Sequence, residues 1–140
     1  MTTEKAANVS RRNGHDWCLL CGARNPWSLN LSFRADGEGA VNTEFSPHPR
    51  LQGYQGVLHG GVISALLDSA MTHCLFHRGV RAVTGDLRVR FLRPASCRGP
   101  LRLTARVLSS TPRLYRLRAE LSDDKGILAW GEAKFLRRRE

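Results

Sequence analysis

One carboxylate stands apart in this sequence of 140 residues. Between Arg50 and Arg78 the only Asp, Glu, Lys or Arg is Asp68, and it lies within the most apolar stretch of the chain, residues 58–76. Burying a lone carboxylate costs free energy unless it finds partners, and groups held in such surroundings often mark functional sites. Asp68 could therefore act as a general base or as a nucleophile. The alternative is an acid that points at solvent or at a subunit boundary and has no chemical role.

The sequence His59-Gly60-Gly61 lies just ahead of this carboxylate, where a helix would begin. The first N–H groups of a helix have no partner within the helix, and the dipole places positive charge there. Two glycines remove the side chains that would keep a ligand away from those N–H groups. Such a helix start could polarise a carbonyl group or hold an oxyanion. A Gly-Gly pair alone usually indicates tight packing, so the interpretation depends on Asp68 following on the same helix.

Hydrophobic periodicity indicates the elements that must position these residues. Residues 58–76 lack strand alternation and are apolar around most of the circumference, which predicts a buried helix. His73 and His77, late in this helix, are expected at its surface or at an interface. Alternating apolar residues predict strands at 29–33, 41–45, 86–92, 101–107, 113–121 and 127–136. Short connections predict that the later strands pair as an antiparallel meander, and a sheet wrapped on one buried helix is an α+β fold.

Length and composition limit the classes of protein. A chain of 140 residues makes one domain, and we expect a flexible leader over residues 1–14 and the domain over 15–140. Residues 1–10 lack the apolar core of a signal peptide and no apolar run is long enough for a membrane helix, so a cytoplasmic protein is expected. The net charge of +10 favours an anionic partner, such as nucleic acid, a membrane surface or a phosphorylated metabolite.

Three stretches of the chain, residues 51–68, 18–29 and 83–95, together resemble one known family, the hotdog-fold acyl-CoA thioesterases of the phenylacetate-pathway and 4-hydroxybenzoyl-CoA thioesterase type. Their signature is similar to residues 51–68, LQGYQGVLHGGVISALLD, and the Cys-x-x-Cys-Gly opening of many members is similar to residues 18–29, CLLCGARNPWSL. The strand after their helix resembles residues 83–95, VTGDLRVRFLRPA. The resemblance covers about residues 17–138. It implies a hotdog fold, with an antiparallel sheet around one long central helix, and an enzyme that hydrolyses an acyl-CoA thioester to the free acid and coenzyme A.

The resemblance also implies roles for individual residues. The family's catalytic carboxylate would be Asp68, and the N–H group that binds the thioester carbonyl would belong to Gly60. Gly61 would help to form the turn, and His59 would shape the helix start. Thr72, one helical turn past the acid, would orient the attacking water or the carboxylate. The site would lie between two subunits of a homodimer or homotetramer, and no cofactor is implied because coenzyme A is part of the substrate.

Further substrate-binding residues are expected around this site. Members of the family often carry an Asn or Gln before the helix that contacts the carbonyl, and both Gln52 and Gln55 are candidates here. The second subunit is expected to contribute three residues of one strand: Thr84, Asp86 and Arg88. The phosphates of coenzyme A suit arginine, whose guanidinium donates two parallel hydrogen bonds. Three arginines on strand ends and loops are our candidates for this role: Arg93, Arg98 and Arg113.

Two alternatives stay open at the level of sequence. Asp68 could deprotonate a water molecule or attack the thioester directly, and neither residue type nor spacing decides between these routes. The alternative function is a non-catalytic acyl-CoA-binding protein, or a basic nucleic-acid-binding protein, on the same fold. A basic tail at residues 137–139 fits the second reading, but the sequence contains no RNA- or DNA-reading motif. Neither nucleic acid nor a membrane is therefore expected as a partner.

Cys18 and Cys21, with His15 three residues upstream, have the spacing of metal ligands. A structural zinc site takes four protein ligands, usually from a second pair, and the sequence has no second Cys-x-x-Cys. Cys74 falls in the predicted helix and Cys97 in a loop. We therefore expect no metal, and four reduced thiols in a cytoplasmic protein.

Overall fold

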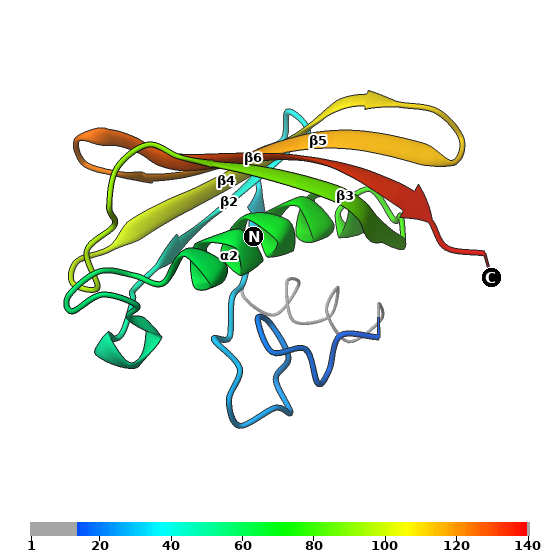
Figure 1. The fold of residues 1–140 in the computed structure, drawn as a ribbon. Helices are drawn as coiled ribbons and strands as arrows, with labels where there is room; N and C mark the ends of the chain where they lie inside the picture. The colour runs from blue at the N-terminus through cyan, green and yellow to red at the C-terminus, as the bar shows by residue number, and fades with distance from the viewer. Residues whose placement is uncertain (1–13, 140) are drawn as a thin grey trace.

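The computed structural model describes residues 14–139, which form one antiparallel sheet packed on one long helix (Figure 1). The helix α2 spans Gly60–Phe76, and a single 3-10 turn, η1, spans Pro49–Leu51. The strands are β1 (Arg34–Ala35), β2 (Ala40–Phe45), β3 (Ala82–Phe91), β4 (Leu101–Ser110), β5 (Leu114–Asp123) and β6 (Gly126–Arg137). Their order in the sheet is β1-β2-β4-β5-β6-β3. The predicted α+β architecture is confirmed, while the predicted leader lies, apart from Gly14, outside the described residues.

The core lies between α2 and the face of the sheet that the helix covers. Leu66, Leu67 and Met71 of α2 have no exposed surface, because they sit where helical periodicity turns them toward the strands. Every second residue of the central strands meets them, since side chains alternate between the two faces of a sheet. The buried strand residues include Leu103, Ala105, Leu117, Ala119, Leu121, Ala133 and Phe135.

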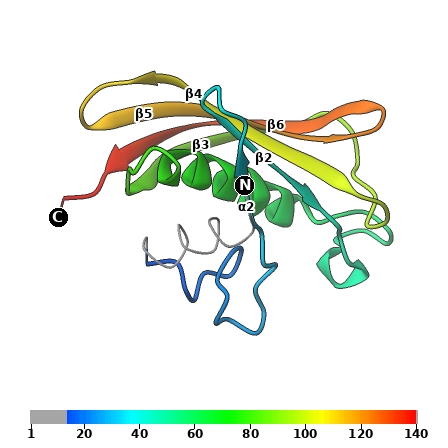
Figure 2. The ribbon, with the colours of Figure 1, turned by 180° about the vertical axis from the view of Figure 1, so that it is seen from behind.

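Residues 14–33 cover the side of α2 that faces away from the sheet (Figures 1 and 2). The ring of His15 lies 4.9 Å from that of Phe76, and the ring of Phe33 stacks on that of His73 at 4.8 Å. This second cover explains why α2 is apolar around most of its circumference. It also makes the expectation for one histidine wrong, because His73 is 4% exposed and lies under the covering segment.

The long strands confirm the sequence reading except in one pairing. Strands β4, β5 and β6 form the predicted meander, but β3 pairs with β6 and lies at the edge of the sheet. The meander rule fails because residues 92–100, between β3 and β4, are long enough to cross the end of the sheet. A bridge between Val57 and Ser96 holds this connection against the segment that leads into α2.

The strand predicted at 29–33 is also wrong, since β1 contains only Arg34 and Ala35 and lies wholly after that range. The N–H groups of Leu29 and Leu31 donate to the carbonyls of Leu19 and Leu20. These residues therefore extend the covering segment instead of joining the sheet.

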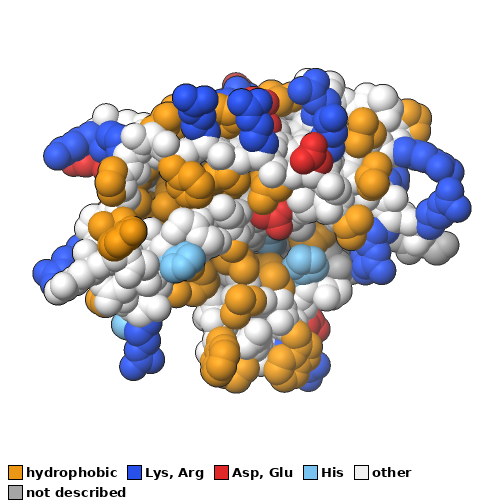
Figure 3. All heavy atoms as spheres, in the orientation of Figure 1, with side chains coloured by type: hydrophobic (Ala, Val, Ile, Leu, Met, Phe, Trp, Pro, Cys, Tyr) orange, Lys and Arg blue, Asp and Glu red, His pale blue; other side chains and the backbone are white. Residues whose placement is uncertain are grey.

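Positive charge is concentrated over the sheet, whereas exposed apolar side chains occur both on the strands and on the covering segment. In Figure 3, Lys and Arg side chains gather over the sheet, while hydrophobic side chains gather on the lobe below α2, which the covering segment builds. Trp17 and Trp27 of that segment are 63% and 81% exposed. In residues 14–139 no helix is long and apolar enough to cross a membrane.

Candidate active site

Asp68 lies half-buried in the middle of α2, on the polar stripe that the helix period forms with Ser64 and Thr72. Its Oδ1 accepts a hydrogen bond of 2.5 Å from Thr84 Oγ1 of β3. Burial raises the pKa of this carboxyl group above its ordinary value, and the Thr84 hydrogen bond opposes part of that rise. The charges of Cys18 and His15 act on it as smaller influences of opposite sign. The molecule thus holds a carboxylate with raised proton affinity at a fixed place.

An irregularity in β3 decides which of its side chains reach this carboxylate. The register between β3 and β6 shifts between Thr84 and Asp86, so the intervening Gly85 is a bulge residue. Thr84 therefore turns toward α2, whereas Asp86 and Arg88 lie on the other face of the sheet, where the Arg88 guanidinium stands 5.8 Å from the Trp130 ring. The sequence predicted all three as a group contributed by a second subunit. The structure separates them, and it places Thr84 on Asp68 within one chain.

The helix start has the geometry that the glycine pair indicated. His59 is the N-cap, and its Nδ1 accepts the Gly61 N–H at 2.8 Å. A Cβ at Gly61 would lie 3.1 Å from that ring, so a larger residue there would require the capping ring to shift. The N–H of Gly60 belongs to the first residue of α2 and so has no acceptor within the helix. Gly60 borders the ring of Phe91, which an added Cβ would approach to 3.5 Å.

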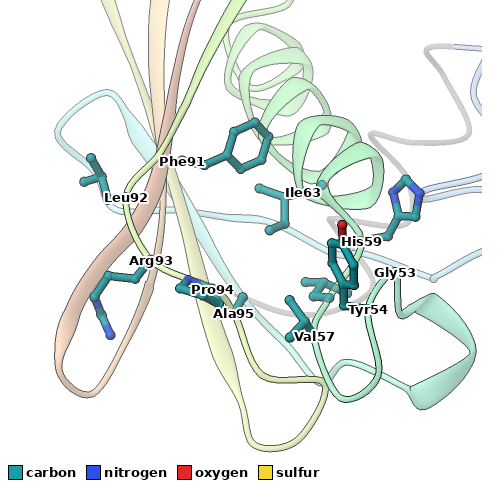
Figure 4. A pocket seen from close by; sticks show the side chains of 12 residues that line it. Gly53, Tyr54, Val57, His59, Ile63, Phe91, Leu92, Arg93, Pro94 and Ala95 are labelled. Atoms are coloured by element: carbon teal, nitrogen blue, oxygen red, sulfur yellow. The ribbon is translucent and has the colours of Figure 1, made fainter.

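A cavity of about 560 Å³ opens beside this helix start (Figure 4). It lies between the first turn of α2, the loop before it and the end of β3 with the residues that follow. The lining is largely apolar, and Phe91 and Ile63 point toward each other across it, while Arg93 points away. The lining residues are Gly53, Tyr54, Val57, Leu58, His59, Gly60, Ile63, Phe91, Leu92, Arg93, Pro94 and Ala95. Such a lining suits an apolar ligand group.

One chain does not bring the two predicted halves of the site together. Gly60 and Asp68 are eight residues apart on α2, which corresponds to about 12 Å along the helix axis. A carbonyl carbon must lie within roughly 3 Å of both its nucleophile and its oxyanion donors to react. Asp68 accordingly does not line the cavity at the helix start.

Other predicted residues have hydrogen bonds of their own. The Thr72 hydroxyl donates to the backbone oxygen of Asp68 at 2.9 Å, and not to its carboxylate. Gln52 Oε1 accepts the Gly56 N–H, so this side chain stabilises the loop before α2. Gln55 is exposed in the same loop.

The predicted phosphate-binding arginines lie far apart in one chain. Arg93 follows β3 and donates to Asp123 Oδ1 at 2.9 Å, so a phosphate would have to compete with that carboxylate. Arg113 precedes β5 at the opposite end of the sheet, where its carbonyl accepts the Arg137 N–H. Ten strand residues separate these two ends, roughly 33 Å of extended chain. One coenzyme A headgroup cannot contact both arginines of the same chain. Arg98, the third candidate, is exposed in the connection between β3 and β4.

A second cluster of reactive groups lies in the covering segment. The donor atoms of His15, Cys18 and Cys21 all lie within 4.8 Å of one another. The pKa of the Cys18 thiol is lowered to about 3, chiefly because Cys18 forms a hydrogen bond with Cys21. Burial opposes this shift, and a hydrogen bond with His15 assists it. The spacing of these three residues was visible in the sequence, but the packing of His15 against His73 and Phe76 of α2 was not.

The family is decided by the comparison with known proteins. The model of the family described as the thioesterase superfamily matches residues 55–129, which is more than half of the chain. The chain belongs to the thioesterase superfamily. The match begins in the loop before α2 and ends in β6, so it includes the helix start, Asp68 and Thr84.

Solved structures show that this thioesterase-superfamily protein has the hotdog fold. The Escherichia coli PaaI protein from the phenylacetic acid degradation operon superposes with a TM-score of 0.78 at 19% identity, over 98% of this chain and 94% of that protein. The smu.793 protein of Streptococcus mutans, solved bound to acetyl CoA, superposes with a TM-score of 0.71 at 16% identity, over 77% of this chain and 88% of that one. At these identities the likeness shows the fold alone.

A sequence relative is a protein of Saccharolobus solfataricus, named only provisionally as an esterase. It is 28% identical over 88 residues, which are 61% of this chain. The match spans 58% of the length of that relative. The relationship therefore covers only part of either protein and leaves the substrate of the whole protein to be proposed.

Proposed function

We propose that this protein hydrolyses an acyl-CoA thioester to the free acid and coenzyme A, with Asp68 as the catalytic carboxylate. One observation carries the proposal: the central helix of a thioesterase-superfamily fold holds a half-buried carboxylate, with a raised pKa, that Thr84 fixes in place. The acetyl CoA bound to the similar hotdog protein of Streptococcus mutans supports the substrate class. The net charge of +10 suits the three phosphates of coenzyme A.

The proposed site is shared by two chains because one chain separates its halves. Strand β3 is a ten-residue edge strand whose outer side has no partner within the described chain. Long open edges of this kind are templates for pairing with another chain, and two-fold dimers are the commonest oligomers. The C-terminal end of β3 places Phe91 at Gly60, and its N-terminal part places Thr84 at Asp68. In a two-fold antiparallel pair of β3 strands, Gly60 of one chain therefore approaches the region of Asp68 in the other.

In this arrangement the thioester carbonyl accepts a hydrogen bond from the Gly60 N–H at the positive end of α2. Negative charge that develops on the carbonyl oxygen is stabilised there. On one route Asp68 takes a proton from a water molecule, whose oxygen bonds to the acyl carbon as the C–S bond breaks. On the other route the carboxylate itself attacks and the mixed anhydride that forms is hydrolysed. Both routes release a thiolate, a good leaving group, which takes up a proton, and the geometry of one chain does not choose between them.

The remaining predicted residues keep supporting roles in this proposal. His59 fixes the first turn by capping Gly61, and Thr72 stands one turn past the acid, where its hydroxyl can meet water. Gln55 of the loop before α2 is proposed to contact the substrate carbonyl. Arg98, which shows no ion pair within the described residues, is the better phosphate ligand of the exposed loops than Arg93, which is paired with Asp123. The protein is proposed to act in the cytoplasm as a homodimer or a pair of dimers.

The direct test is thiol release from a panel of short, medium, long and aromatic acyl-CoA thioesters. The wild type should turn over at least one of them, and the Asp68→Asn variant should lose about 100-fold or more in kcat, the range that general bases contribute. Asp124→Asn, which removes an exposed carboxylate from the β5–β6 turn, is the matched control and should keep wild-type activity. Near-normal turnover by a folded Asp68→Asn protein would remove this residue from the mechanism.

Absence of turnover by the folded wild type on every thioester would contradict the enzymatic proposal. Acyl-CoA binding without hydrolysis would then support the non-catalytic alternative. Strong, salt-dependent binding to DNA would instead support the basic nucleic-acid-binding alternative.

A further inference from the structure

Three soft or borderline donor atoms converge in the segment that covers α2. His15 Nδ1, Cys18 Sγ and Cys21 Sγ all lie within 4.8 Å of one another, and the His15 Nδ1 to Cys21 Sγ distance is 3.6 Å. A tetrahedral zinc ion with Zn–S near 2.3 Å and Zn–N near 2.0 Å holds its nitrogen and sulfur ligands about 3.6 Å apart. The pair is thus already at the separation that one shared ion would impose.

The backbone around the cysteines is built to hold this geometry. The Leu20 N–H donates to Cys18 Sγ at 3.3 Å, and such N–H groups support a metal-bound thiolate from the second shell. The Gly22 N–H donates to the Cys18 carbonyl at 2.8 Å, which closes the turn over the two cysteines. A Cβ at Gly22 would lie 2.4 Å from Cys18 N and 2.5 Å from the Asp16 carbonyl oxygen, so the turn admits only glycine there.

Helix α2 fixes the imidazole ligand and adds an unused polar atom. The His15 ring stands edge-on to Phe76 at 4.9 Å and to His73 at 6.5 Å. Two imidazoles on one tetrahedral ion have ring centres about 5 Å apart, so His73 as placed lies outside the coordination sphere. His73 Nε2 is buried and has no hydrogen-bond partner within residues 14–139. It brings to the neighbourhood of the cluster a ring nitrogen that ordered water can use.

We propose that His15, Cys18 and Cys21 bind one divalent metal ion of the zinc class, with water in the fourth position. Two thiolates and an imidazole select zinc over the hard cations magnesium and calcium. The ion would join three residues of the covering segment to one another, and the His15 ring packs against Phe76 of α2. The expectation of no metal counted four protein ligands as necessary, but a site with three protein ligands and one water satisfies the same coordination number.

The test uses the full chain, freed of any polyhistidine tag and purified under reducing conditions. Elemental mass spectrometry should find about one zinc per chain. After removal of zinc, Co²⁺ should bind once per chain and give the thiolate-to-cobalt charge-transfer band and the visible bands of tetrahedral cobalt, which added Zn²⁺ should abolish. Metal should also raise the Tm of the protein, because binding to the folded state alone stabilises it.

Single variants assign the ligands. Cys18→Ser and Cys21→Ser should each weaken Zn²⁺ binding by more than about 100-fold, the upper range for loss of a mere supporting group. His15→Ala should do the same and lose part of the visible cobalt spectrum. Cys97→Ser changes a thiol that is buried like that of Cys21 but lies far from the cluster in sequence, and it should bind metal like the wild type. Circular dichroism of each variant, taken without metal, separates loss of a ligand from loss of the fold.

Three results would overturn the proposal. One is a folded, fully reduced wild type that binds neither Zn²⁺ nor Co²⁺. Another is Cys18→Ser or Cys21→Ser protein that keeps wild-type affinity and spectrum. The last is a Cys18–Cys21 disulfide in the protein as isolated, combined with failure of the reduced chain to take up metal. None of these readouts depends on thioesterase activity, so failure of the metal site and failure of the proposed enzyme are distinguishable.

Discussion

The start and the middle of helix α2 are organised in opposite ways. At its start, the Gly60 N–H and the surrounding residues border an open cavity of about 560 Å³ that is lined mostly by apolar side chains. Farther along, Asp68 is fixed by Thr84 from the sheet and by burial, with the covering segment packed against the C-terminal turns. The first region offers an electrostatic site whose lining has no carboxylate, and the second holds a carboxylate that does not line the cavity.

This contrast explains why a single chain does not contain both halves of the proposed site. Preorganisation of a buried carboxylate needs a closed environment, whereas entry of an acyl-CoA needs an open one. A helix of 17 residues is long enough to keep both environments on one element, but it also keeps them about 12 Å apart. Pairing two chains along β3 brings the open end of one helix to the closed middle of the other.

The largest effect after loss of Asp68 should come from removing the N–H group at the open end. Gly60→Pro deletes that donor at the first helical position, where proline is tolerated, and the extended His59 before it is compatible with proline. We expect kcat to fall by about 10²–10³, the usual loss for one oxyanion donor.

Gly60→Ala is the control for this change, because it keeps the N–H and adds only a Cβ at ordinary contact distance from Phe91. It should retain kcat within about tenfold. Steady-state kinetics on the best substrate measures both variants. Equal activity of the proline and alanine variants would show that the Gly60 N–H does not bind the carbonyl.

A smaller effect should follow from removing the hydrogen bond that Thr84 donates to Asp68. Thr84 donates the hydrogen bond that lowers the pKa of Asp68, so Thr84→Val should raise that pKa further above its ordinary value. The base must be deprotonated, and its neighbours Cys18 and His15 are unchanged, so the acid limb of the kcat profile should move to higher pH. At alkaline pH the two proteins should differ by only a few-fold. A pH–rate profile whose acid limb stays in place would show that Thr84 does not control Asp68.

The smallest effect concerns stability. Burial raises the pKa of Asp68 in the folded protein, so the unfolded chain loses this proton first and stability falls as the pH rises from about the unfolded value toward the folded one. Asp68→Asn removes the free-energy cost of keeping a buried carboxylate ionised. The Tm of this variant at neutral pH should therefore exceed that of the wild type by roughly 2 °C. The gap should close below the ordinary pKa of aspartate. Calorimetry at neutral and at acid pH measures it, and a lower Tm for the variant at neutral pH would contradict the account.

The sequence was sufficient to predict the helix and the long strands and to single out Asp68 as a candidate residue. The helix from 60 to 76 follows from a long apolar run without strand alternation, and strands β4 to β6 follow from a period of 2, which a single sequence displays directly. Asp68 was visible because a lone charge in an apolar stretch requires an explanation.

The parts that sequence did not predict depend on contacts between distant segments. A one-residue bulge at Gly85 reverses the side of the sheet on which Thr84 lies, and alternation counted along β3 cannot reveal it. The burial of His73 depends on residues 14–33 folding back over α2. The pairing of β3 with β6 depends on the path of residues 92–100. These are tertiary events that leave little local signal.

Complementation between two inactive variants tests the central claim most directly. Asp68→Asn and Gly60→Pro chains, each folded and inactive alone, are refolded together from denaturant and assayed for thiol release. If a site takes Gly60 from one chain and Asp68 from the other, half of the dimers are mixed and each has one intact site of two, so about a quarter of wild-type activity should return. Activity that stays at the level of the separate variants, in a mixture shown to contain mixed dimers, would contradict the shared thioesterase site.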